Sequence, residues 1–296
     1  MAGMSDIAYF KTETSDRLFA ERLDTTSDER LVLVLSKVAE HLHAIIRETR
    51  PTLNDWRATI EFLTEVGHLC DDRRQEWVLV SDLLGMSTLV DALNSDRPGN
   101  ATPNTMRGPF YRADAPLMQQ GENISLDGAG TPVDVTIHLM DLDGRPVAGA
   151  RVETWQANAQ GYYENQQPDL QPEHNLRGHF LSDETGRVTY RTIRPSGYEV
   201  PKDGPLGDLL AKLGAPLCRP AHVYFQVTAE GFETLTTQIF DGEDPNLGKD
   251  PLFSVKPGLI GSFKETKPGS EAALTLDIDF HITPAGRRRM TGPRHN

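Results

Sequence analysis

Hydrophobic residues in the first third of the chain recur at spacings of three and four positions. This spacing places side chains on one face of a helix, and the residues that show it are Leu31, Val34, Leu35, Val38, Leu42, Ile45 and Ile46. Thr26 and Glu29 have the spacing of a capping box before this run, and Pro51 follows it. We therefore expect an amphipathic helix that ends before Pro51. Residues 1–25 are polar and weakly patterned, and we expect them to form an arm.

Two more apolar segments follow the first. Trp56, Ile60 and Leu63 repeat the helical spacing from Thr52 onward, and residues 73–93 carry apolar side chains on more than one side. Faces this broad favour burial against another part of the chain or against another subunit. The pattern predicts a helical N-terminal domain over residues 1–105.

The periodicity changes from helical to alternating after residues 94–105, which are rich in Asp, Pro, Gly and Asn and mark a domain boundary. The alternating residues are Val133, Val135, Ile137 and Leu139, followed by Val152 and Thr154. Turn sequences such as Asp143-Gly144 separate short strands, as in an antiparallel sandwich or barrel. We expect residues 106–296 to be mainly β, with one short helix at 206–213.

Composition excludes several classes of protein. The net charge is −13 and basic residues are scattered, which leaves no basic surface for nucleic acid. No apolar run approaches the eighteen residues of a membrane span, and the N-terminus lacks the order of a signal peptide. The two cysteines, Cys70 and Cys218, lie far apart, which fits a reducing compartment better than a disulfide framework. We expect a cytoplasmic protein.

Tyrosine and histidine residues gather in three short stretches of the β region. In RPAHVYF, residues 219–225, strand alternation points His222 and Tyr224 to the same side. Tyr162 and Tyr163 follow a glycine, and Tyr198 follows Pro-Ser-Gly. A single tyrosine in a β protein usually packs half-buried, but phenolate and imidazole together suit ferric iron. Motifs for zinc hydrolysis, phosphoryl transfer and nucleophilic serine are absent from the sequence.

Several stretches between residues 81 and 263 resemble the intradiol ring-cleavage dioxygenases, which are non-haem ferric enzymes. The matching stretches include SDLLGMSTLVDAL, GPFYRADAP, DLDGRPVAGARVETWQANAQGYY, NLRGHFLSDETGRVTYRTIRPSGY and RPAHVYF. The stretches SDLLGMSTLVD and QQPDLQPEHNLRG look most similar to the hydroxyquinol 1,2-dioxygenase branch. The resemblance implies a helical N-terminal domain, a β-sandwich catalytic domain and opening of a catechol ring by dioxygen to a muconate-type or maleylacetate-type diacid.

The same resemblance implies a ligand set for ferric iron. The family's two tyrosines and first histidine fall on Tyr163, Tyr198 and His222, and Tyr224 stands where the family has its second histidine. Tyr224 could ligate as a third tyrosinate, or swing away and leave its place to water. A third outcome is a protein that binds iron or an aromatic ligand with altered or lost ring cleavage.

Further roles follow from the resemblance. Arg219 stabilises negative charge on the substrate, Gln238 supports the iron ligands, and Tyr198 is a catalytic tyrosinate. The residues implied to bind substrate are Leu79, Asp82, Met106, Arg107, Gly108 and Phe110. Asp82 is otherwise an exposed carboxylate, and Arg107 is either an exposed arginine or a partner for an anionic ring substituent.

Three residues are alternatives to the assigned ligands. His174 and His179 flank NLRG and could supply a substitute imidazole, and Tyr162 is the register alternative to Tyr163. The resemblance also implies a homodimer joined through the N-terminal helices, with a phospholipid-like molecule at the joint. The broad apolar faces of these helices agree with that assembly.

Overall fold

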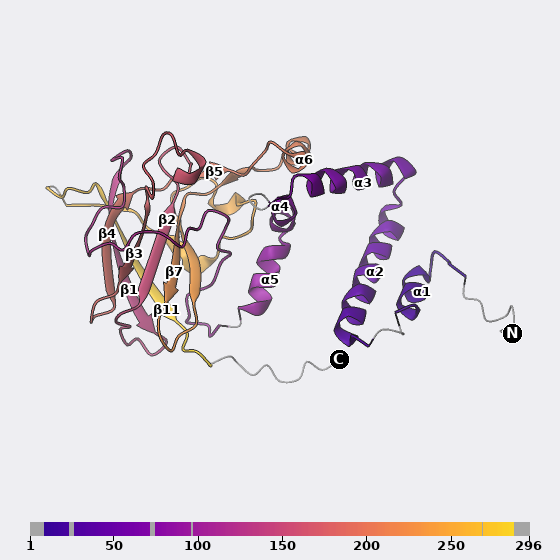
Figure 1. The fold of residues 1–296 in the computed structure, drawn as a ribbon, viewed down its shortest axis with the longest axis horizontal. Coiled ribbons are helices and arrows are strands. Elements are labelled where there is room, and N and C mark those ends of the chain that lie inside the picture. The colour runs from indigo at the N-terminus through magenta and orange to yellow at the C-terminus, as the bar shows by residue number, and fades with distance from the viewer. Residues whose placement is uncertain (1–8, 24–26, 72–74, 96, 268, 287–296) are drawn as a thin grey trace. The chain divides into compact units, whose positions relative to one another are not determined.

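The computed structural model describes residues 9–23, 27–71, 75–95, 97–267 and 269–286 (Figure 1). The chain divides into two compact units, Met1–His68 and Leu69–Asn296. The first unit is helical. The second contains two helices followed by a β-sandwich that carries one further helix.

The first unit contains helices α1 (Ser15–Glu21), α2 (Glu29–Thr49) and α3 (Leu53–His68). The prediction of an arm over residues 1–25 is wrong for the residues that form α1. This helix contacts α2, where the Ser15 hydroxyl lies 3.0 Å from His43 Nδ1. The start of α2 is capped by Asp28, whose carboxylate accepts from the Leu31 N–H at 2.9 Å. Thr26, the expected cap, lies outside the described residues. Helix α2 ends before Pro51, as the sequence predicts.

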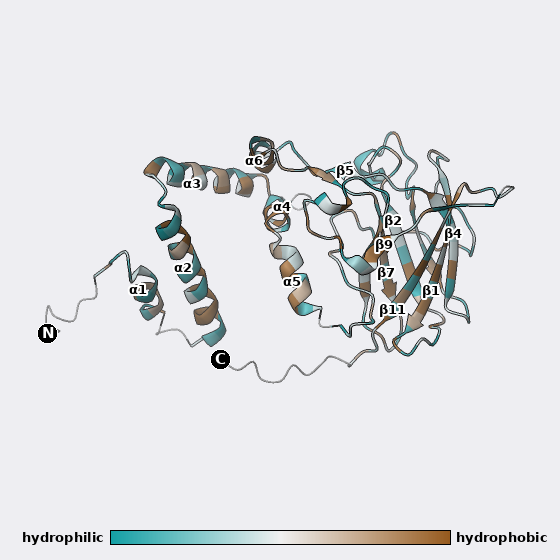
Figure 2. Cartoon of the chain, turned by 180° about the vertical axis from the view of Figure 1, so that it is seen from behind, coloured by the Kyte–Doolittle hydropathy of each residue, from teal (hydrophilic) through white to brown (hydrophobic). Residues whose placement is uncertain are grey.

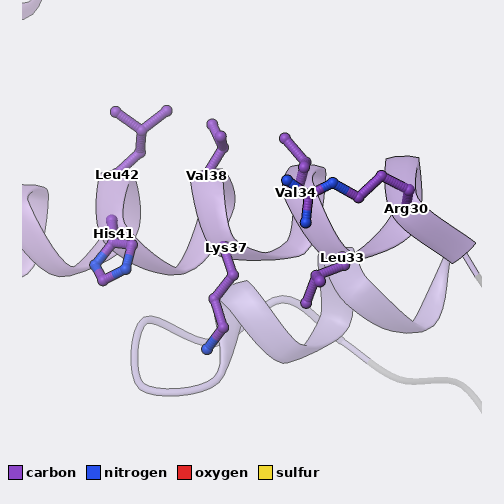
Figure 3. A pocket seen from close by; sticks show the side chains of 7 residues that line it. All are labelled: Arg30, Leu33, Val34, Lys37, Val38, His41 and Leu42. Atoms are coloured by element: carbon purple, nitrogen blue, oxygen red, sulfur yellow. The ribbon is translucent and has the colours of Figure 1, made fainter. Parts of the chain in front are cut away.

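The apolar face of α2 is exposed in the single chain. Its large hydrophobic side chains are between 36% and 55% exposed, and a shallow pocket of about 520 Å³ follows the helix (Figure 3). The pocket is lined by Arg30, Leu33, Val34, Lys37, Val38, His41 and Leu42. Figure 2 shows hydrophobic residues along α2 and again along α5 of the second unit.

The apolar segment 73–93 forms two helices, α4 (Glu76–Leu83) and α5 (Met86–Asn94). The break falls at Gly85, which has a φ of 69°, a conformation that glycine adopts without the steric cost of a side chain. Helix α5 is tied to the sandwich, because the Thr88 hydroxyl donates to the Leu252 carbonyl at 2.9 Å.

The sandwich has two main sheets. The first has the order β10-β11-β1-β4 and the second β3-β2-β7-β8-β9, and a two-stranded ribbon pairs β5 with β6. The strands are β1 (Pro132–Asp141), β2 (Arg151–Gln156), β3 (Arg177–Leu181), β4 (Arg187–Ile193), β5 (Tyr198–Glu199), β6 (Cys218–Arg219), β7 (His222–Thr228), β8 (Leu235–Asp241), β9 (Ile260–Gly261), β10 (Lys264–Glu265) and β11 (Leu274–Ile282).

The sheets are mixed rather than antiparallel throughout. Strand β1 pairs parallel with β11, and β8 pairs parallel with β9, while the other neighbouring pairs are antiparallel. The alternation predicted for β1 is confirmed, since Val133, Val135, Ile137 and Leu139 are all buried in the core. The short helix expected at 206–213 is α6 (Pro205–Leu213). Within the described residues, no helix has the length and apolarity that a membrane crossing needs.

Candidate functional site

The site is built on β7, which lies between β2 and β8 in the second sheet. His222 and Tyr224 share a side of this strand, with ring centroids 5.0 Å apart. Tyr224 is paired in register with Trp155 of β2 and with Gln238 of β8. Cross-strand neighbours on one face of a sheet touch each other. The register therefore places all three side chains on the same face of the sheet as His222.

Two further tyrosines reach the same place, Tyr163 from a loop and Tyr198 from the start of β5. The Tyr163 ring centroid is 5.9 Å from that of Tyr198, which in turn is 5.5 Å from the His222 ring. The segments that carry them touch at Gly161, where a side chain would place a Cβ 2.8 Å from the Gly197 carbonyl oxygen. Only glycine allows this approach. The structure thus brings together the tyrosines and histidine that the sequence singles out.

Tyr163 is fixed by its surroundings. Its ring stacks on Phe110 with centroids 4.3 Å apart, and its N–H donates to Gln166 Oε1 at 2.8 Å. The next residue, Glu164, accepts from the buried Arg177 Nε at 2.6 Å, and Arg177 also donates to the Phe110 carbonyl. This buried ion pair joins the segments that carry the two stacked rings.

His222 has one ring nitrogen engaged and one available. Its Nδ1 lies 2.7 Å from the Pro220 carbonyl oxygen, to which a protonated Nδ1 donates. Its Nε2 is buried and has no hydrogen-bond partner in the part of the chain that the structure describes. Burial and then the Arg219 charge lower the pKa of His222 to about 3, which keeps the imidazole neutral. A neutral imidazole whose other nitrogen bonds a carbonyl is the usual state of a metal-binding histidine.

Other buried polar atoms at this place also lack partners among the described residues. They include Trp155 Nε1, and Tyr163 Oη and Gln238 Oε1, the last two on residues that are 1% exposed. Burial, followed by the neighbouring phenols, raises the pKa of Tyr163 well above its usual value. Buried polar atoms in folded proteins are normally hydrogen-bonded. A bound ion is one explanation for a buried polar atom that has no hydrogen-bond partner. Phenol oxygen and imidazole nitrogen are donors that fit iron, so these residues suit a bound metal.

Tyr224 is held on two sides. Its ring stacks on Trp155 with centroids 5.0 Å apart and planes 3° apart, and its hydroxyl accepts from Arg219 Nη1 at 3.2 Å. Gly108 lies beyond the hydroxyl, so close that a Cβ there would come within 2.7 Å of Tyr224 Oη. Burial raises the pKa of Tyr224 to about 12 against the opposing effect of Arg219. The longer phenol therefore fits because Gly108 has no side chain.

The implied substrate-binding residues lie in different surroundings. Phe110 and Gly108 contact the tyrosines directly. Asp82 is half-buried on α4, where burial raises its pKa, and a hydrogen bond with Ser87 and then the charge of Arg219 oppose the rise. The exposed Arg107 guanidinium lies 4.5 Å above the Tyr111 ring. Two residues complete the set, the half-buried Leu79 of α4 and Met106, which is 45% exposed.

The alternative ligands have other neighbours. His179 Nδ1 lies 2.8 Å from the Ala115 carbonyl oxygen. His174 lies beside the carboxylates of Asp114 and Glu173, which Arg112 already pairs. Tyr162 is 46% exposed whereas Tyr163 is 1% exposed, which favours Tyr163 as the inward residue.

Two contributors to the site are residues that the sequence analysis does not single out. Trp155 stacks on Tyr224, and Asp250 accepts from Arg219 Nε at 3.1 Å. Trp155 could be found only by pairing β2 with β7 in the observed register. Asp250 lies in the loop after β8, which no periodic pattern places.

Comparison with known proteins places this geometry in a family. A family model described as catechol dioxygenase N terminus matches residues 28–102, and one described as dioxygenase matches residues 106–284. A hydroxyquinol 1,2-dioxygenase from Rhizobium sp. strain MTP-10005 is 45% identical over 272 residues, covering 92% of each chain. The chain belongs to the intradiol ring-cleavage dioxygenases.

Solved structures agree with this dioxygenase assignment. The hydroxyquinol 1,2-dioxygenase of Pseudomonas putida DLL-E4 superimposes with a TM-score of 0.88 at 34% identity, covering 92% of this chain and 98% of its own. The catechol 1,2-dioxygenase of Acinetobacter sp. ADP1 has a TM-score of 0.77 at 28% identity, with 94% of each chain covered. The predicted fold, helices followed by a β-sandwich, is thereby confirmed.

Proposed function

We propose that this dioxygenase uses O2 to open the ring of hydroxyquinol or of another substituted catechol between its two adjacent hydroxylated carbons. The observation that carries the proposal is the buried cluster in which His222 Nε2 and Tyr163 Oη have no hydrogen-bond partner among the residues that the structure describes. Support for the substrate class comes from the relatives named hydroxyquinol 1,2-dioxygenase and 6-chlorohydroxyquinol 1,2-dioxygenase, which are 45% and 40% identical.

Ferric iron is the cofactor that the donor set fits. Tyr163, Tyr198 and His222 would hold it, with Tyr224 as a third phenol. When bound, the iron supplies Lewis acidity that lowers the pKa of the substrate hydroxyls.

The chain's own residues bind and orient the substrate. Tyr198 Oη is the proposed acceptor for a proton from a substrate hydroxyl. Arg219 Nη1, 3.3 Å from Tyr198 Oη, places a positive charge where oxygen atoms carry developing negative charge. Gln238 Oε1 offers a hydrogen-bond acceptor at the same place. Phe110, stacked on Tyr163, forms an apolar wall that excludes water.

Anaerobic addition of hydroxyquinol to iron-loaded protein, followed by oxygen, tests the proposal. We expect a visible charge-transfer band that appears on binding and decays as oxygen is consumed. A band that persists after oxygen is admitted would instead support the second candidate, a protein that binds iron and an aromatic ligand with altered or lost ring cleavage. The phenol at position 224, held by Arg219 and Trp155, is the observation that favours this candidate.

Replacing Tyr224 with phenylalanine is expected to shift the visible tyrosinate band of the iron-loaded protein, because one phenol oxygen is lost. The absorption spectrum measures this directly. Tyr162→Phe is the matched control, since Tyr162 is half-exposed, and should leave the band unchanged. An identical spectrum for Tyr224→Phe and the unmodified protein would rule out Tyr224 as a ligand.

Arg107 is proposed to recognise an anionic or strongly polar ring substituent. Its guanidinium is exposed beside Tyr111, whose ring contacts Trp155 at a centroid distance of 5.1 Å. Arg107→Leu should lower kcat/KM for a carboxylated catechol relative to plain catechol by about 10-fold, the factor equivalent to one charge-assisted hydrogen bond. Competition kinetics with the two substrates measure the ratio, and an unchanged preference would refute this role.

We propose that the protein is a cytoplasmic homodimer joined through its N-terminal helices, with a phospholipid-like molecule at the joint. The exposed apolar face of α2 and its shallow pocket support this assembly, since such faces are normally covered. Neither cysteine forms a disulfide, in keeping with a reducing compartment. Sedimentation velocity and mass spectrometry of a solvent extract test the dimer and the lipid; a monomer free of lipid would contradict both.

A further inference from the structure

The loop after β8 returns to the site and supplies a buried carboxylate, Asp250. The Asp250 side chain is 2% exposed and lies 3.1 Å from Arg219 Nε through its Oδ1. Backbone N–H groups of the same loop also donate to the carboxylate, from Ser254 at 2.9 Å and from Leu252 at 3.4 Å. The loop backbone therefore fixes Asp250 independently of Arg219.

Arg219 divides its donors between two sides. Nε and Nη2 face the loop, where Nη2 is 3.5 Å from Asp250 Oδ2 and 3.2 Å from Ser254 Oγ. Nη1 faces the site and donates to Tyr198 Oη at 3.3 Å and to Tyr224 Oη at 3.2 Å. A guanidinium is planar and rigid, so holding one edge sets the position of the other.

These contacts are shielded from bulk solvent, because the Arg219 side chain is 3% exposed. A buried guanidinium needs an anionic partner, and one that is hydrogen-bonded through two nitrogens can move little. If the guanidinium turned in its plane so that another nitrogen faced Asp250, Nη1 would move away from both phenol oxygens. The hydrogen bonds from Arg219 to the two phenols thus depend on its contacts with the loop that carries Asp250.

We propose that Asp250 is a positioning residue, which holds Arg219 so that Nη1 lies between the oxygens of Tyr198 and Tyr224. Ser254 helps to hold Arg219 in the same position, because its hydroxyl accepts from Nη2. This role rests on the proposed function in so far as Arg219 acts on the substrate. The placement of Arg219 itself is a property of the protein that can be measured without turnover.

Asp250→Asn tests the role, with Asp241→Asn as the matched control. Asp241 is a buried aspartate at the end of β8, and it accepts from Arg194 Nε at 2.6 Å. Arg194 also pairs with Glu243 and lies over the Phe263 ring. Both variants exchange a buried carboxylate for an amide, but only Asp250→Asn disturbs the arginine at the phenols.

We expect Asp250→Asn to lower kcat for hydroxyquinol by about 10-fold to 100-fold with KM changed less than about 3-fold, since misplacement by an ångström costs this much. Asp250→Glu keeps the charge and should recover part of kcat. Asp241→Asn should lower the Tm by a similar amount while keeping kcat per folded molecule. Equal kcat losses in Asp250→Asn and Asp241→Asn would overturn the proposal.

A crystal structure of Asp250→Asn separates this proposal from the proposed function. We expect Arg219 Nη1 to leave hydrogen-bond distance of Tyr198 Oη, whatever the substrate proves to be. An unmoved guanidinium would overturn the positioning role even if the enzyme cleaves hydroxyquinol. If Asp250→Asn does not fold, Ser254→Ala serves instead, because it removes one acceptor of Nη2 and keeps the carboxylate. The same displacement and an intermediate loss of kcat are then expected, and their absence would overturn the proposal.

Discussion

Replacing His222 with alanine is expected to remove ring cleavage and most of the bound iron. His222 offers the unpartnered imidazole nitrogen of the cluster, and its orientation is set by the Pro220 carbonyl. Loss of a residue that only orients a ligand typically costs 10-fold to 100-fold in metal affinity, and loss of the ligand itself should cost more than about 100-fold. Iron content by mass spectrometry and kcat/KM for hydroxyquinol are the measurements.

His179→Ala is the matched control for that variant. His179 is a half-buried histidine on β3 of the same sheet, and its Nδ1 contacts the Ala115 carbonyl. It should keep its iron and its activity per folded molecule. Full iron occupancy in His222→Ala would contradict the assigned ligand set.

Replacing Arg219 with leucine is expected to affect both stability and catalysis. The change leaves the buried Asp250 carboxylate without its cation, and breaking a buried ion pair from one side costs about 3–5 kcal/mol. It also removes the only positive group that the structure shows donating to Tyr198 and Tyr224 among the described residues. Loss of one preorganised donor to developing negative charge costs about 100-fold to 1,000-fold in kcat.

A double variant separates these two effects. Arg219→Leu combined with Asp250→Leu removes the uncompensated charge, so it should recover much of the free energy of unfolding while kcat stays low. Chemical denaturation and steady-state kinetics measure the two quantities. Recovery of kcat in the double variant would show that Arg219 acts only on stability.

The sequence predicts the architecture well where patterns are local. Alternation in β1, the proline after α2 and the short helix α6 all depend on neighbours in sequence, and the structure confirms them. The parallel pairing of β1 with β11 joins strands more than 130 residues apart, and no local pattern specifies it. The break at Gly85 between α4 and α5 depends on one positive φ within an otherwise continuous apolar segment.

The candidate site is likewise predictable from the sequence only in part. Tyr163, Tyr198 and His222 stand in recognisable motifs, and their rings meet in the structure. The residues that hold them are found only through tertiary contacts, because Trp155 acts through strand register and Asp250 through a loop. How Tyr224 fits is also a tertiary property, since it depends on the bare backbone of Gly108.

Incubation with hydroxyquinol under isotopically labelled dioxygen tests the central claim most directly. The account predicts a ring-opened diacid that contains both labelled oxygen atoms, formed only with iron-loaded protein and lost in His222→Ala. Oxygen uptake equal to that of a protein-free control, with quinone as the product, would contradict it.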